Sequence, residues 1–141
     1  MTATVEQIKN IMYQSTGSVT FFKRTGSQYM DYTEGVMALQ RECDMYWFVD
    51  LMYSHMPAIV KDFQETEETF YIVYLDVAED KSAKLKIIRE GYDHGTGETV
   101  DIVVVEQDIP YVDLPKIELK FFLELASYEP LVYRMCCPME H

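Results

Sequence analysis

His94 lies between Asp93 and Gly95 in the turn-rich segment GYDHGTGET at 91–99, where a positioned imidazole would act as a general base. No nucleophile in a fitting context stands near it, so an exposed loop histidine is the alternative interpretation. The glycines of this segment do not follow the spacing of GxGxxG or of a Walker A loop, and a strand is expected to follow them. We therefore predict no phosphate-binding loop here.

Asp50 lies within MYWFVDLMYSHM at 45–56, a run that is apolar nearly all round and predicts a buried central helix. An ionised carboxylate in a core is costly unless it is paired, and Arg41, His55 or a backbone cap would be its partner. The favoured interpretation is a satisfied polar group that orients the helix against a sheet. A catalytic acid is the alternative.

Cys136, Cys137 and His141 offer three soft metal ligands within six residues. Adjacent cysteines do not reproduce the CxxC geometry that wraps one zinc ion, and no fourth ligand is evident. The carboxylates of the chain contain no DxDxDG calcium loop. We therefore predict no metal site and no cofactor.

The charge balance is the most unusual property of the composition, since 24 Asp and Glu against 12 Lys and Arg give a formal net charge of −12. Nucleic acid and anionic membranes are bound through Lys and Arg, so this balance disfavours both as direct partners. Two interpretations stay open. The acid either keeps a small protein soluble or forms a surface that binds a basic protein.

Three cysteines, two of them adjacent, do not form the framework of a secreted disulfide protein. The first 14 residues lack the apolar run of a signal peptide, and no stretch reaches the roughly 18 apolar residues of a spanning helix. We expect a cytoplasmic protein. Its 141 residues and 48% apolar content predict one domain over 1–141.

The N-terminal part predicts helices. Apolar residues recur at three- and four-residue spacing within 2–14, and a second helix is expected to start after Thr33. Val19–Arg24 and Gln28–Tyr32 are expected to form a hairpin or an extended turn. Pro57 is expected to end the central helix, and the polar stretch 61–69 is expected to be a loop.

The C-terminal part predicts strands, because β-branched and aromatic residues alternate with polar ones between turn-forming residues. The expected strands are Phe70–Val77, Ala83–Arg89, Val100–Gln107, Lys116–Leu125 and, at an edge, Leu131–Cys136. Helices followed by strands indicate an α+β class. We predict N-terminal helices packed on one face of a four- or five-stranded antiparallel sheet.

Acidic residues of this half fall at predicted strand ends and loops, where they would join into one negative surface. We predict that this surface binds a partner protein through Asp76, Glu79, Asp80, Glu98, Asp101, Glu106, Asp108 and Asp113.

Five segments of the sequence resemble a bacterial and phage family, a domain of unknown function. They are TGS at 16–18, FFKR at 21–24, DYTEGVMAL at 31–39, YWFVDLM at 46–52 and DLPKIELKFFLE at 113–124. Members of this family share successive Thr-Gly, tyrosine-threonine-acid-glycine and tyrosine-tryptophan-x-x-aspartate blocks. The acidic segment near 62–69 and the CCPMEH tail lie outside that pattern. The resemblance implies a small cytoplasmic protein associated with mobile elements and supplies no active site.

Three hypotheses about function follow. The favoured one is a non-enzymatic, anti-defence (anti-CRISPR-like) inhibitor, a nucleic-acid mimic that occupies a basic nucleic-acid-binding site on a host protein, as a monomer or homodimer. The second is a small enzyme that uses Asp50 or His94 with a pocket beneath the sheet. The third is a homo-oligomeric structural module that pairs through Leu131–Cys136.

Overall fold

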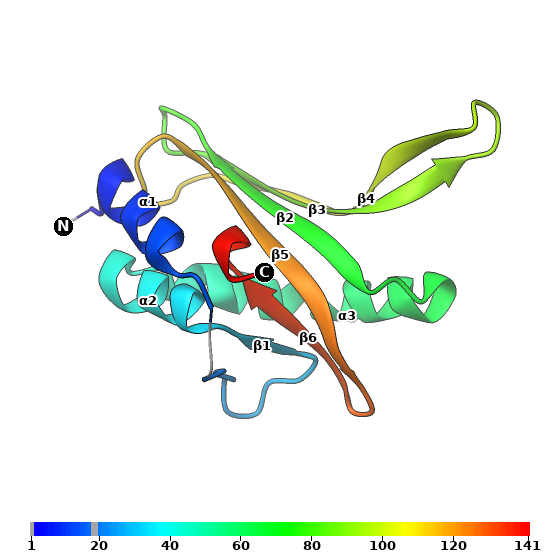
Figure 1. The fold of residues 1–141 in the computed structure, drawn as a ribbon. Helices are drawn as coiled ribbons and strands as arrows, with labels where there is room; N and C mark the ends of the chain where they lie inside the picture. The colour runs from blue at the N-terminus through cyan, green and yellow to red at the C-terminus, as the bar shows by residue number, and fades with distance from the viewer. Residues whose placement is uncertain (1, 18–19) are drawn as a thin grey trace.

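The computed structural model describes residues 2–17 and 20–141, so the predicted segment that begins at Val19 lies partly outside the described residues. The three α-helices and the short strand β1 come first along the chain, and five longer strands follow (Figure 1). The elements are α1 (Val5–Gln14), β1 (Met30–Tyr32), α2 (Glu34–Cys43), α3 (Tyr46–Thr66), β2 (Phe70–Val77), β3 (Ala83–Asp93), β4 (Glu98–Ile109), β5 (Ile117–Tyr128), β6 (Leu131–Cys136) and the short 3-10 helix η1 (Pro138–Glu140). The α+β class is confirmed.

The sheet has six strands in the order β1-β6-β5-β2-β3-β4. Four of the five neighbouring pairs are antiparallel, but β1 runs parallel to β6, with Met30 opposite Tyr133. The prediction of a purely antiparallel sheet of four or five strands is therefore wrong. The reason is that β1 has three residues and pairs with a strand about one hundred positions away, which no local pattern indicates.

The predicted position of Leu131–Cys136 at a sheet edge is also wrong. β6 has its predicted bounds, but β5 lies on one side of it and β1 on the other. Tyr32 also forms an isolated antiparallel bridge with Phe22, which is what remains of the predicted hairpin among the described residues. The two edges of the sheet are β1 and β4.

Helix α3 packs on one face of the sheet, and the other face, called the open face below, is covered in part by the ring of His141, which contacts Phe70 and Phe122. Phe48 of α3 contacts Phe121 of β5, with ring centroids 4.9 Å apart. Alternate residues of β2, among them Tyr71 and Val73, are buried beneath the helices. Their neighbours along the strand point to the open face, as the two-residue period of a strand requires.

Helix α3 continues through Pro57 to Thr66, so the predicted helix end at Pro57 and the predicted loop over 61–69 are wrong. A proline inside a helix costs about 3 kcal/mol, because it removes one backbone hydrogen bond and crowds the preceding turn. Packing beyond the proline offsets that cost: Ile59 is fully buried, and Asp62 pairs with Arg89 of β3 at 2.8 Å. Within the described residues, no helix is long and apolar enough to cross a membrane.

The β3–β4 hairpin extends past the rest of the sheet as a two-stranded arm (Figure 1). β2 pairs with β3 only as far as Ile88, whereas β3 and β4 remain paired up to Asp93 and Glu98. The predicted turn over 91–99 is therefore shorter than expected, because Gly91–Asp93 continue the strand.

Candidate partner-binding surface

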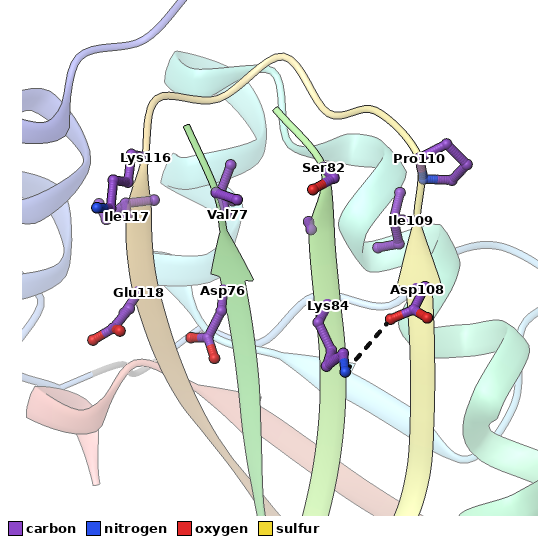
Figure 2. Close-up of a pocket in the computed structure, with 12 residues that line it drawn as sticks. Asp76, Val77, Ser82, Lys84, Asp108, Ile109, Pro110, Lys116, Ile117 and Glu118 are labelled. Atoms are coloured by element: carbon purple, nitrogen blue, oxygen red, sulfur yellow. Dashed lines mark ion pairs between the residues drawn. The ribbon is translucent and has the colours of Figure 1, made fainter. Parts of the chain in front are cut away.

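A row of charged side chains crosses the open face of the sheet near the ends of four strands (Figure 2). The strand register places Glu118 of β5 opposite Asp76 of β2, Asp76 opposite Lys84 of β3, and Lys84 opposite Asp108 of β4. All four side chains are exposed. They lie next to one another because each occupies an open-face position of its own strand and the strands are in register.

Among the residues that the structure describes, the single cation of this row, Lys84, forms ion pairs only with carboxylates of β4. Lys84 pairs with Asp108 at 3.7 Å and with Glu106, the next open-face residue of β4, at 3.2 Å. Hydrogen bonding to Glu106 and the charge of Asp108 raise the pKa of Lys84, which stays protonated. Among the described residues, no ion pair is formed by Asp76 or Glu118.

The pKa of Asp76 is raised above its ordinary value. Burial is the larger cause and the charge of Glu118 is the second, while the charge of Lys86 opposes both. Like charges directly opposite each other on an antiparallel pair are destabilising. The side of the row formed by β2 and β5 therefore carries unneutralised negative charge.

The row lines a wide depression of about 760 Å³ at the strand ends. Ser82, Pro110 and Lys116 lie at its upper rim in the close-up (Figure 2). Lys116 pairs with Glu79 of the β2–β3 turn at 3.6 Å, with both side chains largely exposed. The arrangement presents exposed carboxylates to solvent over a broad concave surface, which suits contact with the lysines and arginines of a protein surface.

The residues predicted to bind a partner do not form one group. Asp76 and Asp108 line the depression, Glu106 lies beside them on the open face, and Glu79 and Asp80 lie in the adjoining β2–β3 turn. Asp113 lies in the loop before β5, where it accepts a hydrogen bond from the Thr2 hydroxyl at 2.6 Å and lines a separate groove beside Trp47 and Leu51. Glu98 lies at the far end of the arm, whereas Asp101 lines a second depression of about 350 Å³ that Asp76 and Lys84 also line. The expectation that these eight residues form one partner-binding surface stays a prediction.

Asp50 and His94 occupy different parts of the molecule. The Asp50 side chain is 63% exposed and pairs with Arg24 at 2.7 Å, so the expectation of a carboxylate inside the core is wrong. The helix is buried on one side only, and Asp50 lies on the other. His94 is exposed in the turn of the arm, where its ring contacts Tyr92. His55, one of the predicted partners of Asp50, instead forms a hydrogen bond between its Nε2 and Oε1 of Gln107 at 2.5 Å.

The C-terminal cysteines and His141 have different surroundings. Cys136 and His141 both contact Glu124, whereas Cys137 is fully buried, and its backbone N–H donates to Glu140. Within residues 2–17 and 20–141, no group of three or more His, Cys, Asp or Glu side chains is placed to hold a metal ion. Burial raises the pKa of Cys136 to about 12, so its thiol is protonated at neutral pH.

Glu118 is the functional candidate that sequence reasoning missed. The alternation of apolar and charged residues over 117–125 places it on the solvent side of a strand. Glu118 matters because the strand register places it opposite Asp76. Sequence reasoning missed it because these two residues lie about 40 positions apart in the chain.

Fold and site together define a small α+β domain with helices on one face of a mixed sheet and an acidic depression on the other. The chain belongs to a family of unknown function, DUF6876, whose model matches residues 6–141. No curated protein and no solved structure matches the chain.

Proposed function

We propose that the protein is a non-enzymatic binding protein whose open sheet face binds a basic surface of a partner protein. The observation that carries the proposal is the unneutralised pair of carboxylates, Asp76 and Glu118, in a concave and exposed position. A lysine or arginine from a partner would relieve their repulsion and would pay little desolvation cost at such an exposed site.

The rest of the depression supports the same proposal. Glu106 and Asp108 are exposed and share a single lysine, Lys84, so they too can accept a second cation. The formal net charge of −12 adds a long-range attraction for basic proteins, which speeds association at low salt.

The more specific proposal is that the partner is a nucleic-acid-binding host protein and that this protein occupies its basic site as an anti-defence inhibitor. The exposed carboxylates of Glu118 and Asp76 lie on neighbouring strands about 4.8 Å apart, and Asp108 follows beyond Lys84, so that closely spaced negative charges face a partner as they do along a nucleic-acid backbone. The mobile-element association implied by the family resemblance agrees with this role.

The test is affinity capture from host lysate with the wild-type protein and two charge-reversal variants. The site variant carries Asp76→Lys and Glu118→Lys. The control variant carries Glu42→Lys and Glu65→Lys, on exposed positions of α2 and α3, and therefore changes the net charge equally.

We expect the wild type and the control to capture a basic nucleic-acid-binding protein at about 50 mM salt and to release it at about 500 mM. The site variant should not capture it. Capture of no basic protein, or equal loss with the two variants, would contradict the proposal, because the depression would then have no particular role.

A further inference from the structure

Strand β4 is a long free edge of the sheet. It has twelve residues, and β3 is its only neighbour in the strand order. In the described part of the chain, no turn, loop or helix donates a backbone hydrogen bond to the outer side of Glu98–Ile109 or accepts one from it. An edge of this kind pairs readily with an extended segment of another chain.

The charges on β4 favour pairing with a basic segment of another chain. The strand carries four carboxylates, those of Glu98, Asp101, Glu106 and Asp108, and contains no lysine or arginine. A second copy of β4 would bring like charges together, which disfavours pairing of the protein with itself at this edge. A basic segment would be attracted.

An apolar groove lies on the other face of the same edge. It has a volume of about 390 Å³ and is lined by Trp47 and Leu51 of α3, Gln107 and Ile109 of β4, and Tyr111 of the following loop, together with the carboxylates of Asp44 and Asp113. Gln107 and Ile109 alternate along β4 with Glu106 and Asp108, which both pair with Lys84 on the open face. The open face of this edge therefore carries the carboxylates of β4, whereas most of the side chains that line the groove are apolar, although Asp44 and Asp113 line it as well.

We propose that the C-terminal half of β4, Val105–Ile109, binds an extended partner segment in which basic and apolar residues alternate. The segment would add a seventh strand. Its basic side chains would lie over Glu106 and Asp108, and its apolar side chains would enter the groove beside Trp47 and Leu51. This inference rests on the proposed function, because it specifies how the basic partner is bound.

Two capped peptides of identical composition test the proposal. KVRVKLRV alternates basic and apolar residues, whereas KRKRVVLV separates them into blocks and cannot place them on opposite faces of a strand. Affinities are measured by fluorescence anisotropy, and amide hydrogen exchange shows which backbone groups of the protein become protected.

We expect KVRVKLRV to bind about tenfold more tightly than KRKRVVLV and to slow exchange in β4. Tyr111→Ser should weaken binding of KVRVKLRV about threefold, since the ring lines the groove. Tyr13→Ser is the matched control, because Tyr13 and Tyr111 are both 64% exposed and Tyr13 lies on α1. The double change Glu106→Lys and Asp108→Lys should weaken binding of both peptides.

Equal affinities of the two peptides, with no protection of β4, would overturn the inference and leave the proposed function intact, because charge alone would then explain binding. Absence of binding by both peptides would also overturn it. The proposed function fails separately, when capture from lysate yields no basic partner.

Discussion

Asp76 and Glu118 lie directly opposite each other on β2 and β5, and both carboxylates point to the open face of the sheet (Figure 2). Proteins commonly avoid like charges at such positions, because their repulsion is not screened by an intervening strand. Repulsion between the two carboxylates lowers the stability of the fold slightly, and both lie in an exposed, concave position. That combination is expected of a surface selected for binding rather than for folding.

The first prediction concerns the cost of this pair. The pKa of Asp76 is raised in the folded state, so the folded protein binds more protons than the unfolded chain between the ordinary value near 3.8 and the folded value. Stability therefore falls as pH rises through this window. Asp76→Asn should raise the free energy of unfolding by about 0.5 kcal/mol at about pH 7 and leave it unchanged at about pH 3. Urea denaturation at both pH values checks this, and a loss of stability at about pH 7 would contradict it.

The second prediction contrasts two aspartates of α3. The Asp62 side chain is largely buried, accepts a hydrogen bond from the Tyr71 hydroxyl at 2.7 Å and pairs with Arg89. Asp62→Asn should cost about 2 kcal/mol, since it leaves a buried guanidinium without its counter-charge. The matched change Asp50→Asn should cost less than about 1 kcal/mol, because that carboxylate is exposed. Equal costs in urea denaturation would show that burial does not set the strength of these pairs.

Strand bounds could be predicted where the pattern is local. β2 and β6 begin and end at the predicted residues, Phe70–Val77 and Leu131–Cys136, because each is a β-branched and aromatic run bounded by turn residues. Helix α3 could not be predicted in full. The rule that proline ends a helix is a local one, and the burial of Ile59 together with the ion pair between Asp62 and Arg89 of a distant strand overrides it.

The candidate site could be predicted only in part for the same reason. Glu106 and Asp108 were identified because acidic residues cluster along the sequence there. Glu118 and the groove beside Trp47 depend on which strands are neighbours and in what register. These are properties of the folded chain, and a single sequence does not encode them in any local pattern.

The third prediction concerns the three thiols. Cys43, Cys136 and Cys137 are all buried, and burial is the largest cause of a raised pKa at each. Thiolates are the reactive species, so the folded protein should resist iodoacetamide at about pH 8 and the protein in urea should take up three labels. Intact mass spectrometry measures the number of labels. Rapid labelling of Cys136 in the folded protein would mean that the C-terminal tail opens readily.

The fourth prediction concerns the arm formed by β3 and β4. A Cβ added at Gly91 would lie 2.7 Å from Cγ1 of Ile102 on the neighbouring strand and would also meet its Cδ1. The side chain of Ile102 must therefore move in Gly91→Ala, at a cost of about 1 to 3 kcal/mol. Because the arm extends past β2, this cost should appear as faster amide hydrogen exchange at Val100 and Ile102, with little change in the β2–β5 pair.

A double-mutant cycle separates this clash from a general effect of the extra methyl group. Ile102→Ala removes both crowding atoms, so Gly91→Ala should cost much less in that background than in the wild type. Both variants keep the carboxylates of Glu98 and Asp101, so the charge of the arm is constant throughout the cycle. An equal cost of Gly91→Ala in the two backgrounds would show that contact with Ile102 is not the reason for a glycine in this strand.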